Sequence, residues 1–257
     1  MTPLPIGPRD VIALRRHVRS SEALRGPLLV SGVLADQLAR ELSAGAAPGA
    51  VRTSGDPGQV SALVHVVAGD GTPEDERVLR AATRALLPLV VVQLDDTAPR
   101  LPYVLATDVV TCEPGKGFPV DEIAKTLART LGTDGASLAR SLPAIRDAYQ
   151  EQRAEESALG AAALAATGGD VPKLGLLTLA QARALTDIAT ARGDQRDEGP
   201  RAEAATIGAP LAAALATGLV ARALVRRLPG RNRLFEALVA GSATYALATI
   251  FRRFGRL

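Results

Sequence analysis

The sequence predicts an α/β fold with a doubly wound, mostly parallel five-stranded sheet, followed by an all-α C-terminal domain with a helical hairpin. Between about residues 26 and 132, short continuous apolar runs alternate with amphipathic stretches. This pattern is typical of parallel strands that are covered by helices on both faces. The second half of the chain has no strand-like run, and it ends in two long, nearly uncharged stretches.

Five strands are expected because each candidate segment is rich in Leu and β-branched residues. They cover residues 27–31, 50–53, 63–67, 89–93 and 108–112. The helices expected between and after them cover residues 33–43, 72–87 and 120–131. Thr72 is a good N-cap for the second helix, since Pro73 and three acidic residues occupy its first turn. Gly132 is placed to end the last one.

The rest of the chain is predicted to be helical. A leader helix is expected at 10–19, and Leu138, Leu142, Ile145 and Tyr149 form one helical stripe. Thr178 and Gln181 fit a capping box that opens a helix ending at Gly193. We therefore expect four regions: a leader helix at 1–25, the α/β domain at 26–132, a helical connector and linker at 133–175, and a basic helical domain at 176–257.

Charge separates the end of the chain from its body. Residues 201–257 carry nine arginines against Glu203 and Glu236, a net charge of +7, which leaves −4 for the remainder of a chain whose total is +3. A basic end on an acidic body indicates an anionic partner, such as lipid headgroups or nucleic acid. Aromatic residues make up only 3% of the chain, which argues against nucleic acid because base stacking has few side chains to use.

Two features bear on the compartment. Cys112 is the single cysteine, so an intramolecular disulfide and a multi-cysteine metal site are excluded. The first eight residues contain three prolines and no apolar core, unlike a signal peptide. The chain is therefore expected to be cytoplasmic, at the inner face of the cell membrane if its basic end binds lipid.

The order of the expected elements resembles a degenerate Era-like GTPase domain. The third strand is followed by Ala68-Gly69-Asp70, and residues 111–117 (Thr-Cys-Glu-Pro-Gly-Lys-Gly) precede a helix, where such domains carry a Ser-Ala turn. Asp95 is the only residue left of the guanine-reading Asn-Lys-x-Asp pattern. The stretch 176–183 (Leu-Leu-Thr-Leu-Ala-Gln-Ala-Arg) resembles the uncharacterised helical domain found on bacterial GTPase-associated membrane proteins.

The chain lacks the phosphate-binding loop of a working GTPase. That loop needs G-x-x-x-x-G-K-[ST], because backbone N–H groups and a lysine surround the phosphates while a hydroxyl holds magnesium. After the first strand this chain reads Ser-Gly-Val-Leu-Ala-Asp-Gln at 31–37, with no lysine and with Asp36 adding negative charge. The resemblance therefore implies a pseudo-GTPase, and we expect no enzymatic activity and no cofactor.

One loop is a candidate ligand site. Gly115, Lys116 and Gly117 follow a strand and precede a helix, where open α/β sheets bind ligands, and Asp95 follows the neighbouring strand. Free N–H groups and Lys116 offer an anion site. The alternative is an ordinary glycine-rich turn with a solvated lysine.

The remaining candidates have simpler interpretations. His65 is expected to be a packed strand residue without an acidic partner, His17 a solvated residue and Cys112 a buried apolar one. Asp95 and Asp96 form a turn-like pair with a weaker alternative as a divalent-ion site. No triad, dyad or metal cluster is expected.

The C-terminal helices, at about 202–228 and 233–254, are the most informative feature. Their uncharged stretches, 206–221 and 237–251, span 16 and 15 residues, whereas crossing a bilayer takes roughly 20. A spanning hairpin would also put arginines on the far side, against the positive-inside tendency. The alternatives are helices lying in the membrane interface, or helices packed on the 178–193 helix as a three-helix domain.

The sequence thus predicts a non-catalytic, membrane-associated or partner-docking protein with a pseudo-GTPase domain. Its partner is an anionic membrane surface or a protein, and self-association is a further alternative. Two other functions stay open: residual binding of a nucleotide or phosphoryl ligand, and non-specific nucleic-acid binding by the basic end. The expected contact residues are Arg222, Arg226, Arg227, Arg231, Arg233, Arg252 and Arg253.

Overall fold

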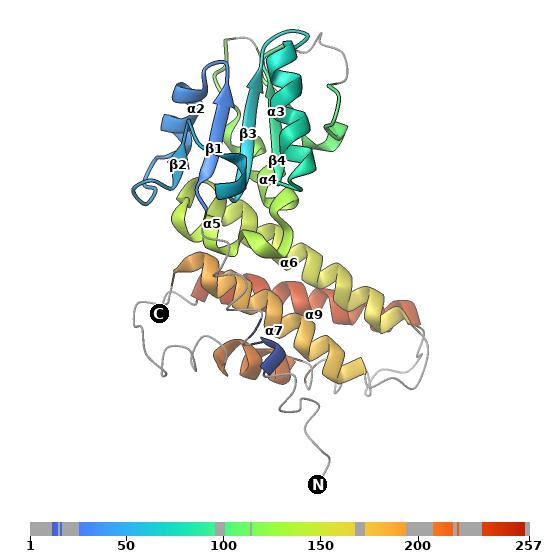
Figure 1. Cartoon of the computed structure of the whole chain (residues 1–257). Helices are drawn as coiled ribbons and strands as arrows, with labels where there is room; N and C mark the ends of the chain where they lie inside the picture. Colours follow the sequence, from blue (N-terminus) through green and yellow to red (C-terminus); the bar gives the residue numbers. More distant parts are fainter. Residues whose placement is uncertain are drawn as a thin grey trace. The chain divides into compact units, whose positions relative to one another are not determined.

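The structure of the chain is a computed structural model (Figure 1). It describes residues 12–14, 16, 26–95, 101–113, 115–167, 173–193, 208–217, 220 and 233–254. The chain forms two compact units. The first runs from Ser21 to Tyr149 and contains the sheet, and the second combines Met1–Ser20 with Gln150–Leu257 and is helical where it is described.

The α/β unit is built on a five-stranded sheet in which all neighbours pair in parallel. Its strands are β1 (Leu28–Gly32), β2 (Val51–Arg52), β3 (Ala62–Val67), β4 (Leu89–Gln93) and β5 (Val109–Thr111). Their order is β2-β1-β3-β4-β5. The chain therefore winds outward to β2 and then crosses to the other side of β1, which puts the topological switch point between β1 and β3. The predicted fold class is confirmed.

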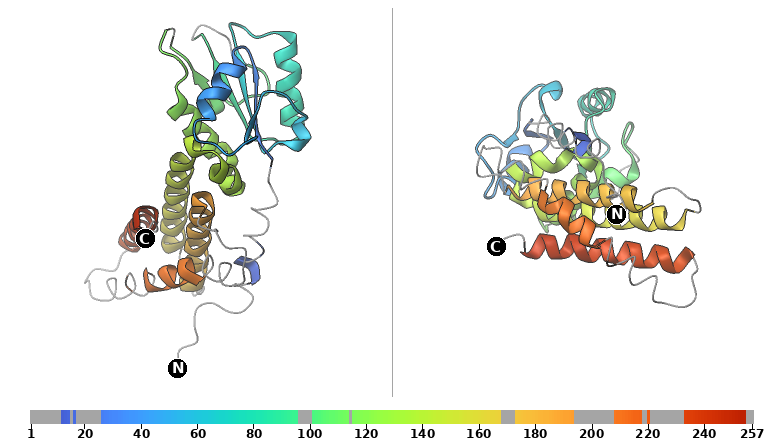
Figure 2. Two further views of the ribbon diagram at one scale, coloured as in Figure 1. Left: turned by 90° about the vertical axis from the view of Figure 1, so that its left-hand side faces the viewer. Right: turned by 90° about the horizontal axis from the view of Figure 1, so that it is seen from below.

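Helices cover both faces of this sheet. Helix α3 (Pro73–Arg84) covers one face, while α2 (Ala35–Leu42) and α4 (Val120–Leu131) cover the other (Figures 1 and 2). The unit is completed by α5 (Ala136–Ser141) and by the 3-10 turns η1 (Pro57–Gln59), η2 (Ala106–Asp108) and η3 (Gly132–Gly135). Most of these bounds match the predicted segments within a few residues, and β4 and α4 match them fully.

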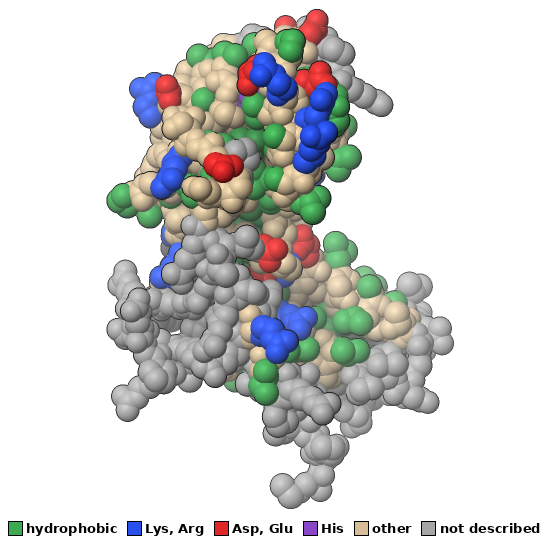
Figure 3. Space-filling view, viewed as in Figure 1, with side chains coloured by type: hydrophobic (Ala, Val, Ile, Leu, Met, Phe, Trp, Pro, Cys, Tyr) green, Lys and Arg blue, Asp and Glu red, His purple; other side chains and the backbone are tan. Residues whose placement is uncertain are grey.

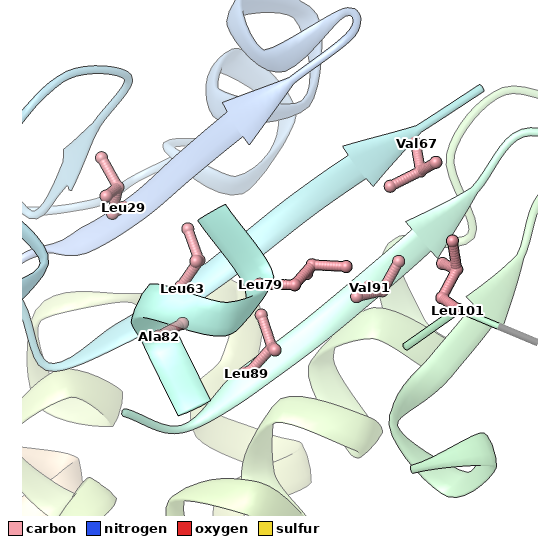
Figure 4. Packing of buried hydrophobic residues seen from close by; sticks show 8 residues of the cluster. All are labelled: Leu29, Leu63, Val67, Leu79, Ala82, Leu89, Val91 and Leu101. Atoms are coloured by element: carbon pink, nitrogen blue, oxygen red, sulfur yellow. The ribbon is translucent and has the colours of Figure 1, made fainter. Parts of the chain in front are cut away.

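The core under α3 is aliphatic. Alternate residues of β1, β3 and β4 point toward the helix and pack against its buried side, as Figure 4 shows. The cluster consists of Leu29, Leu63, Val67, Leu79, Ala82, Leu89, Val91 and Leu101. Each large member that is fully buried stabilises the fold by about 1.5–3 kcal/mol relative to an exposed side chain. This cluster fixes α3 over β3 and β4, and so fixes what its first turn can reach.

The helical unit has α7 at its centre. Its helices are α7 (Lys173–Arg192), α9 (Arg233–Phe254), residues 208–217, and the part of α6 (Pro143–Ala166) that follows Tyr149. Nearly every side chain of α7 from Gln181 to Ala191 is buried. Ala182 packs with Leu14 and Ala214, and Leu185 and Ile188 pack with Ala154 and Ala248. The predicted packing of the C-terminal helices on this helix is confirmed for the described residues.

Polar contacts join these helices inside the unit. Arg153 of α6 donates from Nε and Nη2 to Oδ2 of Asp187 on α7, at 3.1 and 2.9 Å, and both residues are buried. The amide nitrogen of Gln181 donates to Oγ1 of Thr244 on α9 at 2.6 Å. Such buried pairs specify how helices align, because breaking one leaves a polar group without a partner.

Two predictions for this half are wrong. Thr178 and Gln181 do not cap a helix, since α7 begins at Lys173 and both side chains are buried inside it. The stripe from Leu138 to Tyr149 is not one helix either, because α5 ends at Ser141 and α6 begins at Pro143. The break at Leu142, which has extended backbone, follows from the proline after it, which disfavours a helical conformation.

Some predictions concern residues outside the described ranges. The leader helix at 10–19 is described only at 12–14 and 16, which are helical. The linker at 168–172 and much of the 202–228 helix also lie outside. None of the helices in the described part of the chain combines the length and the apolar character that crossing a bilayer requires.

Candidate functional site

A polar chain of side chains lies on the α3 face of the sheet, near the carboxyl ends of β1 and β3. Ser31 of β1 pairs in register with His65 of β3, so both side chains point to the same face. Asp75 comes from the first turn of α3 on that face. The carboxyl edge at the switch point is where open α/β sheets bind their ligands.

The hydrogen bonds of this chain are short and continuous. Ser31 Oγ lies 2.8 Å from His65 Nδ1, and His65 Nε2 lies 2.8 Å from Asp75 Oδ1. The second oxygen of the carboxylate, Oδ2, accepts from the backbone N–H and from the hydroxyl of Thr72, each at 2.7 Å. Both rings of contacts are local to one site, so the hydroxyl of Ser31 is linked to a carboxylate through an imidazole.

Asp75 is fixed by the start of α3. Thr72 is the N-cap, and the reciprocal bonds between Thr72 and Asp75 complete a capping box, so the predicted cap is confirmed. Burial by itself raises the pKa of Asp75, but the hydrogen bonds from Thr72 and His65 outweigh it and hold that pKa below its ordinary value. Asp75 is therefore an anion at neutral pH.

An ionised Asp75 determines the tautomer of a neutral His65. A carboxylate can only accept, so the proton must sit on His65 Nε2. Nδ1 then carries a lone pair, and the hydroxyl of Ser31 donates to it. In this arrangement a base is directed at the Ser31 oxygen, which is the relationship between nucleophile and base in hydroxyl-based covalent catalysis.

Exposure differs along the chain of contacts. His65 and Asp75 are 2% and 8% exposed, whereas Ser31 is partly exposed. The hydroxyl end therefore faces the surface and the carboxylate end faces the protein.

The turn after Ser31 is held tightly against β3. Gly32 has a φ of +91°, and a Cβ there would lie 2.0 Å from the carbonyl oxygen of Val66. The N–H of Val33 donates to the same carbonyl at 3.0 Å. Leu34 adopts a left-handed conformation, with φ of 57°, before α2 begins. Because α2 starts at Ala35, its first-turn N–H groups lie at the same edge as Ser31.

The predicted loop site has a different character. Lys116 Nζ lies 2.5 Å from Glu113 Oε2, and both side chains are about 70% exposed. Gly115 and Gly117 are exposed on the same turn, between β5 and α4. Asp95 is exposed just after β4, the strand next to β5. These residues thus lie at one edge of the sheet, with the lysine charge balanced by a neighbouring carboxylate.

The prediction that His65 lacks an acidic partner is wrong, since Asp75 lies within hydrogen-bond distance. Cys112 is buried as predicted, and burial raises the pKa of its thiol, with a further contribution from Glu41 and Glu122. His17 and Asp96 lie outside the described residues. The part of the chain that the structure describes holds no group of three His, Cys, Asp or Glu side chains suited to a metal ion.

The predicted contact arginines are only partly described. Arg222, Arg226, Arg227 and Arg231 lie outside the described residues, as does the side chain of Arg233, which begins α9. Arg252 is partly buried and Arg253 is exposed. The outer side of α9 carries three exposed apolar side chains, Leu238, Tyr245 and Ile250, at 68, 41 and 55%.

Comparisons with known proteins add no assignment. No protein-family model, curated protein sequence or solved structure matches the chain. The structure itself shows an α/β domain with a five-stranded parallel sheet, followed by helices. Functional inference therefore depends on the geometry of the two units.

Proposed function

We propose that the chain is a peripheral attachment protein whose C-terminal helices bind an anionic membrane surface. Its α/β unit, a pseudo-GTPase in this proposal, presents a surface to a partner protein and does not hydrolyse nucleotides. The observation that carries the proposal is the outer side of α9, which is apolar and ends in arginines. This composition suits a helix that lies in the interface between lipid and water.

Two sides of α9 differ in chemistry. The inner side packs through small residues, with Ala240, Thr244 and Ala248 all buried. The outer side exposes Leu238 and Tyr245, seven residues apart and so on one stripe of the helix, and Arg253 follows in the last turn. An apolar stripe that the rest of the unit leaves exposed is available to enter the outer part of a bilayer.

Charge favours an anionic surface as the occupant. Residues 201–257 carry a net charge of +7. A basic residue close to an anionic leaflet contributes about 1 kcal/mol. Since a few such residues and one shallow apolar stripe act together, the expected attachment is reversible and weakens as salt screens the charges.

The α/β unit does not have the features of an anion-binding unit. On the face that carries α3, acidic and basic side chains are interspersed and do not form an area of one sign (Figure 3). Asp36 is exposed in the first turn of α2, where a GTPase would place phosphate. Because Glu113 balances Lys116, the second candidate function, binding of a nucleotide or phosphoryl ligand, has less support.

Flotation with vesicles tests the attachment. The full chain is mixed with vesicles that contain anionic lipid or only zwitterionic lipid, at low and high salt. Leu238→Asp is compared with Leu105→Asp, since Leu105 lies in the α/β unit and is 69% exposed, nearly the same as Leu238. We expect flotation only with anionic vesicles, lost in the Leu238 variant and kept in the Leu105 variant. A chain that stays with the soluble fraction under all conditions would leave docking to a protein as the better hypothesis.

A further inference from the structure

We propose that Ser31 is a nucleophile activated by His65 and Asp75, and that the α/β unit hydrolyses activated carboxylic esters. This activity goes beyond membrane attachment, because every residue it uses lies in the other unit. It needs no nucleotide and no phosphate-binding loop. The inference depends on four observations: the connectivity of the three side chains, their place in the sheet, the exposure of Ser31, and an unpaired donor on the same face.

The connectivity is that of a nucleophile, a base and an orienting acid. Both nitrogens of His65 are engaged, Nδ1 with Ser31 Oγ and Nε2 with Asp75 Oδ1, each at 2.8 Å. Asp75 in turn is held by two hydrogen bonds from Thr72. Such a set is recognised by geometry and by the role of each group, and no fixed order of residues along the chain is required.

The place of Ser31 agrees with the role of a nucleophile. It is the next-to-last residue of β1, at the carboxyl edge of the sheet beside the switch point. A tight turn through Gly32 then leads into the first turn of α2, where Leu34 provides no side-chain cap for the helix N–H groups. N–H groups without a helical acceptor can bind the oxygen of a substrate carbonyl as negative charge develops on it.

A second polar group on this face supports a bound ligand. Gln93 of β4 points to the α3 side like Val91, it is 7% exposed, and its Nε2 has no hydrogen-bond partner. Buried donors are almost always satisfied, so an unpaired one indicates a group supplied from outside. Gln93 lies two strands from Ser31, about 10 Å at the usual strand spacing, which suits a contact with a remote part of the substrate.

The reaction balances with water as the co-reactant. Ser31 Oγ bonds to the acyl carbon while its proton passes to His65 Nδ1. The bond from that carbon to the leaving alcohol oxygen then breaks, and Nδ1 returns the proton to the alcohol. Water attacks the acyl-Ser31 ester, its proton passes through Nδ1 to Ser31 Oγ, and the carboxylic acid leaves. Asp75 stays ionised and stabilises the imidazolium, which makes it a positioning residue.

A fluorophosphonate probe and p-nitrophenyl butyrate test the proposal on the full chain. The probe is expected to modify Ser31 of the unaltered protein, as peptide mass mapping would show without any variant. Ser31→Ala should lose the modification and at least about 100-fold of the ester turnover, in line with the loss of a nucleophile and its base. Ser43→Ala is the matched control, since Ser43 is an exposed serine of the same unit and should leave both readouts unchanged.

Two further variants separate catalysis from packing. His65→Gln removes the base and should slow the modification of Ser31 about as strongly as it slows turnover. Asp75→Asn keeps an acceptor for Thr72 but turns a donor toward His65, so the pH at which the modification rate is half-maximal should shift. A purely structural role would leave that pH unchanged once thermal unfolding shows the variant to be folded.

The outcomes are distinct from those of the membrane proposal. Modification of Ser43 as fast as Ser31, no modification of any serine, or turnover that persists in Ser31→Ala would each overturn the nucleophile assignment. Vesicle flotation is expected to be the same for the unaltered chain and for Ser31→Ala. Either proposal can therefore fail alone.

Discussion

His65 Nε2 lies 2.8 Å from Asp75 Oδ1, and this contact joins the middle of β3 to the first turn of α3. The same carboxylate closes the capping box with Thr72. One side chain therefore starts the helix, fixes it to the sheet and orients the imidazole that faces Ser31. Changes at this residue should be felt both in stability and in the chemistry proposed for Ser31.

Asp75→Asn is predicted to change how stability depends on pH. The folded-state pKa of Asp75 is lowered by its hydrogen bonds, so it lies below the unfolded value, about 3.9 for an Asp side chain. The stabilisation from its charged form is thus fully present above that value and is lost as pH falls through the folded-state pKa. In urea unfolding, the gap between the unaltered chain and Asp75→Asn should narrow from about pH 5 downward. A gap that stays constant to pH 2 would contradict the assignment.

Thr72 is predicted to contribute through its hydroxyl alone. Thr72→Ala removes the acceptor for Asp75 N–H and the hydroxyl donor to Asp75 Oδ2. Loss of such a cap costs about 1 kcal/mol of unfolding free energy. Thr72→Ser keeps the hydroxyl and should stay within a few tenths of the unaltered chain. Equal losses in the two variants would show that the methyl group, and not the cap, is what matters.

The sequence predicts the local parts of this site but not their meeting. Thr72, Pro73 and the acidic first turn define the start of α3 from neighbouring residues alone, and β4 is evident as an uninterrupted apolar run. The contact between Ser31 and His65 spans 34 positions and depends on the register of two strands, which no local pattern contains. Asp75 was predicted only as a favourable first-turn charge; its position at N3 of the helix after β3 was the one available signal that it could reach back to His65.

The error at Thr178 has the opposite cause. The spacing of Thr178 and Gln181 matches a capping box, yet both side chains find partners inside the helical unit, Gln181 with Thr244. Tertiary packing thus replaced a local signal, since a buried hydroxyl or amide can be satisfied by another helix as well as by a helix start. A prediction from spacing alone cannot distinguish the two.

Gly32→Ala is predicted to be strongly destabilising. A Cβ at this position would meet the Val66 carbonyl oxygen at 2.0 Å, and the φ of +91° already disfavours any side chain. Gly49→Ala is the matched control, because Gly49 has a φ of +74° but open space around its Cβ position. The control should lose about 1–2 kcal/mol for the left-handed backbone alone, and Gly32→Ala clearly more, as measured by urea unfolding. Similar losses in both would mean that β3 moves aside without cost.

The helical unit offers a prediction about its buried ion pair. Arg153 and Asp187 are 8% and 1% exposed, and removing one partner of such a pair typically costs about 3–5 kcal/mol because the other charge is left buried. Asp187→Leu should therefore destabilise the chain far more than Lys116→Ala, which removes an exposed pair worth at most about 1 kcal/mol.

The double variant Arg153→Met with Asp187→Leu decides what the pair is for. If the two charges only compensate each other, apolar side chains of similar size should restore most of the stability lost in Asp187→Leu. Arg153 also bonds Glu156, so part of its contribution lies outside the pair and should remain missing after the double change. Thermal unfolding of the two single variants and the double variant measures this coupling. A double variant as unstable as the sum of its single changes would show that each charge is needed for a partner other than the opposite member of the pair.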